Sequence, residues 1–538
     1  MIFNSLEFFV FLPIVLLVYS RLRHKQQNIW LLIASYVFYG WWDPRFLYLI
    51  SISTTIDFFC GKLIDRPTLE PADIRKGLVY LFGSCLVFLG LLGWNGDNSI
   101  EILVLGLIAA TLIIYASSQN ARLSHLGEEK RRKIALAISM CANLGLLGVF
   151  KYFNFFVESA ESALLSFGMS ETSLVHLNII LPVGISFYTF QTMSYSIDIY
   201  RKKLKPCESF IDFALFVSFF PQLVAGPIER ATNLLPKIIQ KRTITWSHLY
   251  SGAGLIAFGL FKKVVIADGV SASVASIYGT SGAVSWVDIT AATLLFTIQI
   301  YCDFSGYSDI ARGTSKLLGI DLMRNFNFPY FSRSPSEFWN RWHISLSSWL
   351  RDYLYISLGG NRKGKWKTYR NLFLTMILGG LWHGAAWNFV LWGAYQGSLL
   401  CLYRFFIPDN KTPNRQRFAF VKFWLSLTVF FLFTMYGWLL FRAESFEQIV
   451  SFTSILFTEF SSQSLSMKIP PLATLVGIPI LVFYEIHGYT RDQAHPEASQ
   501  KIIEPVRSIA KAGLFGLMMF LFVGALSTPP TAFIYFQF

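Results

Sequence analysis

Charged side chains are scarce in this chain. Of its 538 residues only 14% are charged, whereas 54% are hydrophobic and 17% are aromatic. About a quarter of the residues of an ordinary soluble domain are charged. The composition therefore excludes a typical soluble protein and predicts an integral membrane protein.

Several motifs of soluble enzymes are also missing. The sequence holds no GxSxG elbow, P-loop, HExxH motif or dinucleotide fingerprint, which argues against nucleoside triphosphate hydrolysis and zinc proteolysis. Its six cysteines are scattered, without CxxC or other metal-ligand spacing, so no metal site is expected. We interpret them as small buried hydrophobes. They are Cys60, Cys85, Cys141, Cys207, Cys302 and Cys401.

Long apolar runs fill most of the chain. A run of about 17 to 25 residues can cross a bilayer, and about a dozen runs approach that length. We expect an all-α, polytopic membrane protein of about 12 transmembrane helices, with short interfacial or re-entrant helices besides. No hydrophilic segment is long enough for a separate soluble domain. The runs begin near Glu7, Asn28, Phe46, Gly77, Ile100, Lys133, Asn178, Leu249, Val287, Asn371, Phe418, Pro470 and Ala510.

The basic residues indicate an orientation. The first apolar run lacks a basic leader and a small-residue cleavage site, and Arg21–Lys25 follow it, so we interpret it as an anchor rather than a signal peptide. The positive-inside rule then places residues 21–25, 122–133 and 201–205 in the cytoplasm and the N-terminus on the other side. The net charge of +14 fits such loops and needs no nucleic-acid partner.

Two apolar regions are unusually broken or polar. In FVSFFPQLVAGPIER, residues 216–230, prolines and glycine interrupt any regular helix, and such a stretch is tolerated at membrane depth only inside protein or beside a cavity. Residues 334–360 instead place tryptophans at helical spacing, with Ser334 as a possible cap and Pro335 in the first turn. That pattern predicts one helix at the interface or beside a wet cavity.

His383 is the main catalytic candidate. It lies in the stretch Asn371–Tyr403, which has no other acidic or basic side chain, and an ionisable group there is by default a functional hypothesis. A neutral imidazole can take the proton of a hydroxyl that attacks a carbonyl. A histidine that only hydrogen-bonds two helices is the alternative. The small residues Gly379, Gly380 and Gly384 let another helix or a substrate approach closely.

His343 is the second candidate. In the predicted helix it lies about one turn from Asn340 and Ser347, so it could orient a substrate or assist His383. The alternative is an amphipathic anchor between tryptophans at the membrane interface.

Two aspartates, Asp303 and Asp309, end an apolar run and need partners. A structural ion-pair network with arginines is the favoured role. If a covalent acyl-enzyme forms, Cys302 and Ser305 would be nucleophiles by residue type alone, and we expect neither to serve. The arginines considered are Arg312, Arg341 and Arg351.

A compact basic loop, Asn361–Lys367, immediately precedes the His383 stretch. Such a cluster can attract the phosphates of a nucleotide-bearing donor. Ordinary cytoplasmic positive charge explains it equally well.

These segments together resemble the membrane-bound O-acyltransferase (MBOAT) family, and within it the bacterial members that acetylate alginate. The likeness runs from Leu181 to Gly397 in family order. The matching segments are LPVGISFYTFQTMSYSIDIYR from Leu181, FVSFFPQLVAGPIER from Phe216, QIYCDFSGYSDIARG from Gln299, EFWNRWHISLSSWLRDYLYISLGGNRKG from Glu337 and YRNLFLTMILGGLWHGAAWNFVLWGAYQG from Tyr369.

The resemblance implies a membrane O-acyltransferase that moves acetyl groups toward an extracytoplasmic polysaccharide such as alginate. It implies that His383 is catalytic and His343 is the second functional residue, in a ring of helices around a thinned centre. Acetyl-coenzyme A is the implied cytoplasmic co-substrate, with no permanently bound cofactor. The implied site is the bacterial inner membrane, with a periplasmic acetyltransferase as partner. Acetylated cellulose, another exopolysaccharide or peptidoglycan are alternative acceptors, and D-alanyl transfer to teichoic acid is less favoured.

We divide the chain into N-terminal transmembrane helices (1–150), a catalytic core (151–442) and C-terminal transmembrane helices (443–538). Two apolar runs between Gly77 and Ser117 look like an insertion into the alginate pattern. The competing hypothesis is a non-catalytic acyl-donor conduit or scaffold, in which His343, Asp303, Asp309 and His383 line a polar path and a periplasmic partner does the chemistry.

Overall fold

The described part of the chain contains helices and connections only. The computed structural model describes residues 1–44, 46–95, 125–169, 174–177, 180–224, 226–280, 282–407, 419–460, 466–493, 504–526, 531, 533 and 534. Contacts divide the chain into two units, Met1–Gly252 with Thr314–Leu322, and Ala253–Gly313 with Met323–Phe538. The predicted all-α class is confirmed for the described residues.

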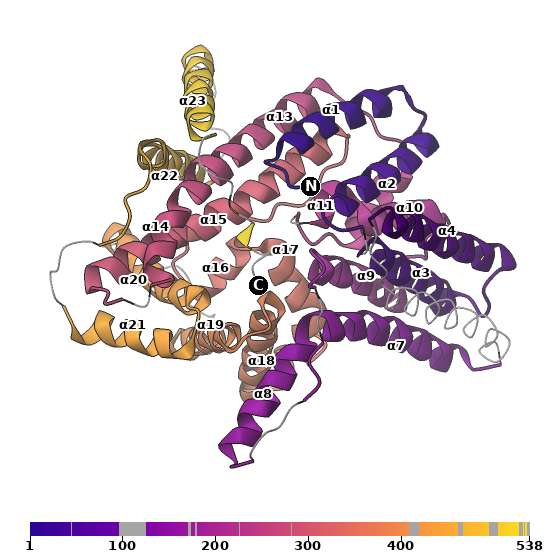
Figure 1. The fold of residues 1–538 in the computed structure, drawn as a ribbon, viewed down its shortest axis with the longest axis horizontal. Coiled ribbons are helices and arrows are strands. Elements are labelled where there is room, and N and C mark those ends of the chain that lie inside the picture. Colours follow the sequence, from indigo (N-terminus) through magenta and orange to yellow (C-terminus); the bar gives the residue numbers. More distant parts are fainter. Residues whose placement is uncertain are drawn as a thin grey trace. The chain divides into compact units, whose positions relative to one another are not determined.

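In the first unit three helices, α3, α7 and α9, pack side by side (Figure 1). Asp57 of α3 is buried at this junction and accepts a hydrogen bond from Asn143 of α7 at 2.8 Å. Polar side chains of this kind hold helices together inside membranes. The helices of this unit are α1 (Leu6–Arg21), α2 (His24–Gly40), α3 (Phe46–Asp65), α4 (Pro71–Asn95), α7 (Glu128–Leu147), the π-helix η1 (Gly148–Tyr152), α8 (Phe153–Ser166), α9 (Ile185–Tyr200), α10 (Phe210–Ser218), α11 (Phe220–Leu223) and α12 (Ala231–Ile239).

The broken stretch at residues 216–230 lies in the first unit. Helix α10 ends at Ser218, the short α11 ends at Leu223, and α12 begins only at Ala231. Residues 216–224 and 226–229 are buried. The prediction of an irregular segment enclosed in protein is confirmed for these residues.

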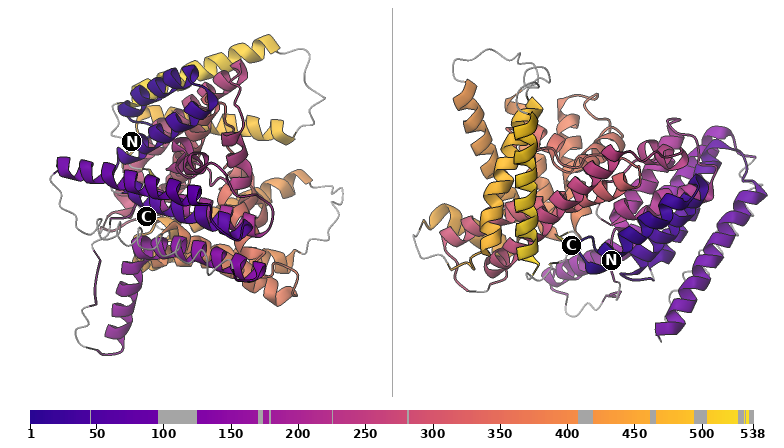
Figure 2. Two further views of the ribbon diagram at one scale, coloured as in Figure 1. Left: turned by 90° about the vertical axis from the view of Figure 1, so that its right-hand side faces the viewer. Right: turned by 90° about the horizontal axis from the view of Figure 1, so that it is seen from above.

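The second unit holds the remaining helices, although the first turns of α13 and the last residues of α15 belong to the first unit. Near its C-terminal end α22 and α23 pack against each other (Figure 2). The helices are α13 (Trp246–Leu260), the π-helix η2 (Phe261–Asp268), α14 (Gly269–Tyr278), α15 (Trp286–Leu317), the 3-10 helix η3 (Pro329–Phe331), α16 (Pro335–Arg341), α17 (Ile344–Trp349), the π-helix η4 (Leu350–Tyr355), α18 (Lys365–His383), α19 (Trp387–Phe406), α20 (Ala419–Arg442), α21 (Phe446–Thr458), α22 (Leu472–Gln493) and α23 (Glu504–Ala525).

The stretch Asn371–Tyr403 is not one crossing. It folds as the antiparallel hairpin of α18 and α19, joined by residues 384–386. Glycines make the hairpin tight, because a Cβ at Gly380 would lie 2.2 Å from the Phe389 carbonyl oxygen and one at Gly393 would lie 2.5 Å from that of Met376. The predicted close approach of another helix is confirmed. His383 is therefore the last residue of a helix and does not lie in mid-span.

The predicted single helix over residues 334–360 is also broken. Its start is as expected, since the Ser334 hydroxyl accepts from the Glu337 amide and Pro335 begins α16. The helix stops at Arg341, and His343 adopts left-handed backbone angles of φ 42° and ψ 54° before α17 begins. Such a conformation costs a non-glycine residue about 1–3 kcal/mol and needs tertiary contacts to hold it.

Five described helical segments are long and apolar enough to cross a membrane. The chain is a membrane protein, whereas the count of about 12 crossings and the boundaries at residues 150 and 442 stay predictions. The part of the apparent insertion from residue 96 to residue 117 lies outside the described residues. The expectation that the cysteines are buried is confirmed for Cys60, Cys207 and Cys302. It is wrong for Cys141, which is exposed, and Cys401 is only partly buried.

Candidate functional site

His383 lies where the α18–α19 hairpin turns. Its side chain is 4% exposed. Edge-on aromatic rings enclose the imidazole: the ring centroids of Trp382 and Trp392 are both 5.1 Å away, and that of Phe441 is 5.5 Å away. Helices α18, α19 and α20 thus each contribute a wall.

His343 is completely buried, and its ring is held by Asn325. Its Nδ1 lies 3.1 Å from the Asn325 Oδ1, and the Asn325 carbonyl oxygen accepts from the Ile344 amide at 2.9 Å. Asn325 therefore contacts both the side chain of His343 and the backbone just after it. These bonds hold the left-handed turn.

The contacts of Asn325 also assign the tautomer of His343. The backbone amide of Ser345, which can only donate, bonds the Asn325 Oδ1 at 3.3 Å, while the Asn325 amide nitrogen donates to the Ser308 hydroxyl at 3.3 Å. The oxygen of Asn325 is thus an acceptor, so the Nδ1 of His343 must carry the hydrogen. The neutral ring then keeps its lone pair on Nε2.

The fold brings the two predicted site histidines together. Their ring centroids are 6.4 Å apart, which is too far for a direct hydrogen bond of about 3 Å and close enough for both rings to contact one small group between them. Burial, and secondarily the nearby His383, hold the pKa of His343 well below its usual value. A neutral His343 beside His383 suits proton transfer to and from an uncharged hydroxyl.

A network of buried charges adjoins this site. Lys263 of η2 pairs with Asp303 at 2.7 Å and with Asp268 at 2.8 Å, and Lys262 pairs with Asp309 at 2.7 Å. Phe304, the residue after Asp303, packs its ring edge-on against that of His343, with the two ring centroids 4.6 Å apart. The network thus anchors the segment of α15 that supports the second histidine.

Three described residues near the C-terminus, Thr531, Phe533 and Ile534, also contact the network or the helix that carries it. The Ile534 amide donates to Asp303 at 2.7 Å, and the Thr531 hydroxyl donates to Asp268. Phe533 is fully buried against the rings of Phe304 and Tyr307. The tail therefore contributes to the packing behind Phe304.

The predicted partners of the aspartates are right in one case. Arg312 pairs with Asp309 at 3.2 Å. The two other arginines pair elsewhere, because Arg341 bonds Glu337 and Arg351 bonds its neighbour Asp352.

The two candidate nucleophiles belong to the charged surroundings. Ser305 accepts a hydrogen bond from Lys262 at 2.9 Å, and Cys302 is fully buried.

The residues predicted to lie near His343 do not bond its ring. Asn340 is exposed, and the Ser347 hydroxyl donates to the Trp342 carbonyl oxygen. The Nδ1 of His343 instead bonds Asn325.

Sequence reasoning missed several residues of the site. The adjacent lysines Lys262 and Lys263 stand in an apolar run, which is a visible signal of buried charge. Asn325 stands in an irregular connection without such a signal, and the aromatic walls are indistinguishable from core residues. Among the described residues, no three His, Cys, Asp or Glu side chains gather as a metal site.

His343 and His383 thus form a buried pair of imidazoles in a helical membrane chain. Comparison with known proteins supplies the class: residues 200–441, which include both histidines, match the membrane-bound O-acyltransferase family. The chain belongs to this family and is an O-acyltransferase.

Its relatives are bacterial. The chain is 35% identical over 557 residues to the probable alginate O-acetylase AlgI of Pseudomonas putida, with all of both chains covered. It is 38% identical to the protein of that name from Pseudomonas aeruginosa, over 83% of this chain and 73% of the relative. It is 31% identical to the peptidoglycan O-acetyltransferase of Helicobacter pylori, over 83% and 78% of the two chains.

Proposed function

We propose that this protein moves acetyl groups from cytoplasmic acetyl-coenzyme A toward an extracytoplasmic polysaccharide such as alginate, with His383 as the general base. The observation that carries the proposal is the enclosed pair of imidazoles, His343 and His383, 6.4 Å apart between ring centroids. The similarity to alginate O-acetylases favours acetyl as the acyl group and a polysaccharide as the final acceptor.

The reaction balances with these two residues. The acceptor hydroxyl oxygen attacks the thioester carbonyl, and His383 takes the hydroxyl proton. The carbon–oxygen bond forms as the carbon–sulfur bond breaks, and the proton passes from His383 to the departing thiolate. The single hydrogen of the attacking hydroxyl goes to His383, so His343, with its lone pair on Nε2, accepts a hydrogen bond from a second hydroxyl of the acceptor and orients it.

The aromatic walls serve this step. Trp382, Trp392 and Phe441 surround His383 and exclude bulk water, which limits hydrolysis of the thioester.

The proposal includes the surroundings of the enzyme. In this proposal the chain crosses the bacterial inner membrane about a dozen times, with basic loops such as residues 201–205 in the cytoplasm. A periplasmic acetyltransferase takes the acetyl group onward to the sugar.

The test is transfer of labelled acetyl from acetyl-coenzyme A to cell-surface polysaccharide. Membranes with wild-type protein or His383→Ala are compared at equal expression, and partner binding is measured by co-purification. Loss of label with intact, partner-bound protein supports the general base. Unchanged label would contradict it and favour a conduit or scaffold whose partner does the chemistry.

A further inference from the structure

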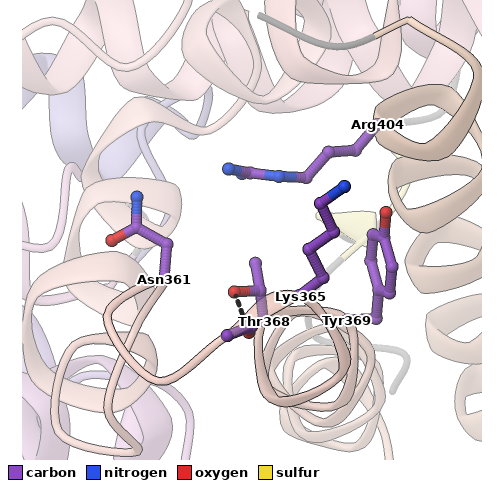
Figure 3. Close-up of a pocket in the computed structure, with 6 residues that line it drawn as sticks. Asn361, Lys365, Thr368, Tyr369 and Arg404 are labelled. Atoms are coloured by element: carbon purple, nitrogen blue, oxygen red, sulfur yellow. Dashed lines mark hydrogen bonds between the residues drawn. The ribbon is translucent and has the colours of Figure 1, made fainter.

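A polar cavity of about 210 Å³ lies at the first turn of α18, at the opposite end of that helix from His383 (Figure 3). It is formed within the second unit by the loop before α18, the start of α18 and one side chain of α19. The lining residues are Asn361, Gly364, Lys365, Thr368, Tyr369 and Arg404.

The chain builds this cavity from a tight loop. Gly359, Gly360 and Gly364 have φ values of 111°, 56° and 92°, a region that only glycine adopts at low cost. The Asn371 side chain pins the loop by donating to the carbonyl oxygens of Leu358 and Gly360 at 3.3 and 3.0 Å. The backbone of the loop that borders the cavity is therefore held in place.

The antiparallel hairpin adds a second cation. Because α19 runs back along α18, Arg404 near the end of α19 reaches the first turn of α18. Figure 3 shows that Lys365 and Arg404 extend their charged ends into the same space, with the Asn361 amide on the other side.

The lining is rich in donors. Its side chains carry two cations and no carboxylate. Gly364 precedes α18 without a capping side chain, so the amides of the first turn and the positive end of the helix dipole are directed toward the cavity end of the helix. The Thr368 hydroxyl does not donate into the cavity, because its hydrogen bonds the Gly364 carbonyl oxygen at 2.9 Å. Two cations brought together beside a helix N-terminus are stabilised by an anion.

We infer that this cavity binds a phosphate group of a small ligand. The guanidinium of Arg404 can hold two phosphate oxygens at once, and Lys365 adds a point charge. Two sources share this chemistry: the phosphates of the acetyl-coenzyme A donor, an assignment that rests on the proposed function, and the headgroup of an anionic phospholipid.

Direct binding tests the phosphate chemistry without turnover. Adenosine 3′,5′-bisphosphate is titrated into the purified full-length chain in neutral detergent, with adenosine as the phosphate-free comparison. Arg404→Gln and Lys365→Gln should each weaken binding of the bisphosphate about tenfold, in keeping with a lost charge-assisted hydrogen bond. Lys367→Gln removes one positive charge from the first turn of α18 at a residue that does not line the cavity, and should change the affinity less than twofold.

Two further measurements separate the sources. If the donor is the ligand, Arg404→Gln raises the KM for acetyl-coenzyme A about tenfold and leaves kcat unchanged. If a lipid is the ligand, phosphatidylglycerol added to phosphatidylcholine nanodiscs raises the melting temperature of the wild type but not of Arg404→Gln, and the KM stays constant.

The inference is overturned if Arg404→Gln and Lys365→Gln match Lys367→Gln in binding, KM and the phosphatidylglycerol effect. Repeating the titration in His383→Ala keeps this result separate from the proposed function. Binding without acetyl transfer would leave the phosphate site standing and contradict only the assignment of the donor.

Discussion

Two buried polar regions of the second unit adjoin along α15 and are built differently. Around Lys263 the side chains are charged, and each cation meets carboxylates at 2.7–2.8 Å. The neighbouring region begins at Phe304, the residue after Asp303 on α15, which packs edge-on against the ring of His343. That ring also contacts the amide oxygen of Asn325 and the hydroxyl of Ser345. Buried ion pairs that satisfy one another form a rigid frame, whereas a neutral imidazole keeps the capacity to accept a proton. We therefore expect the charged region to support the stability of the fold and the neighbouring histidine region to support the proposed reaction.

The largest effect should come from breaking the charged region. Lys263→Met would leave Asp268 and Asp303 without their shared cation, which typically destabilises a protein by about 3–5 kcal/mol. Thermal unfolding of the purified protein measures this. Lys133→Met, which breaks an exposed ion pair with Glu129, should barely move the melting temperature. Equal melting of the two variants would contradict the framework role.

The histidine region should respond in the opposite way. His383→Gln keeps a polar side chain of similar size but removes the proton acceptor, so acetyl transfer should fall about 10²–10⁴-fold. The melting temperature should stay near that of the wild type. A variant that melts as early as Lys263→Met would show that His383 supports the fold, and one that keeps its activity would exclude it as the base.

A smaller effect should follow from separating the hairpin that carries His383. Gly380→Ala would bring a methyl group to 2.2 Å from the Phe389 carbonyl oxygen, and overpacking of this kind costs about 1–3 kcal/mol. Gly145→Ala in α7 is the control, because its Cβ would meet nothing within 4 Å. Melting curves should show that Gly380→Ala loses stability and Gly145→Ala does not. The same change in both would refute the close packing.

The smallest effect sharpens the comparison by giving the histidine region a charge. Asn325→Asp would place a carboxylate on the Nδ1–H of His343 and favour the imidazolium, so its pKa should rise from its lowered value. If the reaction requires neutral His343, the acidic limb of the profile of kcat/KM against pH moves to higher pH. An unchanged limb would mean that the protonation of His343 does not control the reaction.

Local patterns predicted much of this architecture. The Ser334 cap, the enclosed broken stretch at residues 216–230 and the pairing of Asp309 with Arg312 depend on neighbours in sequence or on composition, and the structure has them. The all-α class followed from apolar runs alone. His383 was singled out because an imidazole is rare in such a run, and the structure places it near His343, the second predicted residue, while the roles of both stay predictions.

Distant contacts account for what sequence reasoning missed. The helix over residues 334–360 breaks at His343 because Asn325, 18 residues earlier, bonds its ring and the next amide. The stretch 371–403 folds as two helices rather than one, and Gly380 and Gly393 let these helices pack closely against each other. The sequence of one helix alone does not reveal such a contact. Among the described residues, Lys263 rather than an arginine pairs with Asp268 and Asp303, and helical spacing carries no information about that choice.

Helix α18 sets the distance between the cavity at Lys365 and His383. From Lys365 at its first residue to His383 at its last, a rise of 1.5 Å per residue amounts to about 27 Å. A helix neither stretches nor shortens appreciably, so its two ends keep this spacing while ligands come and go. If the cavity at Lys365 holds a phosphate of the acyl donor, that donor must span this gap for its thioester to reach His383, and a short donor with the same reactive group could not occupy both ends.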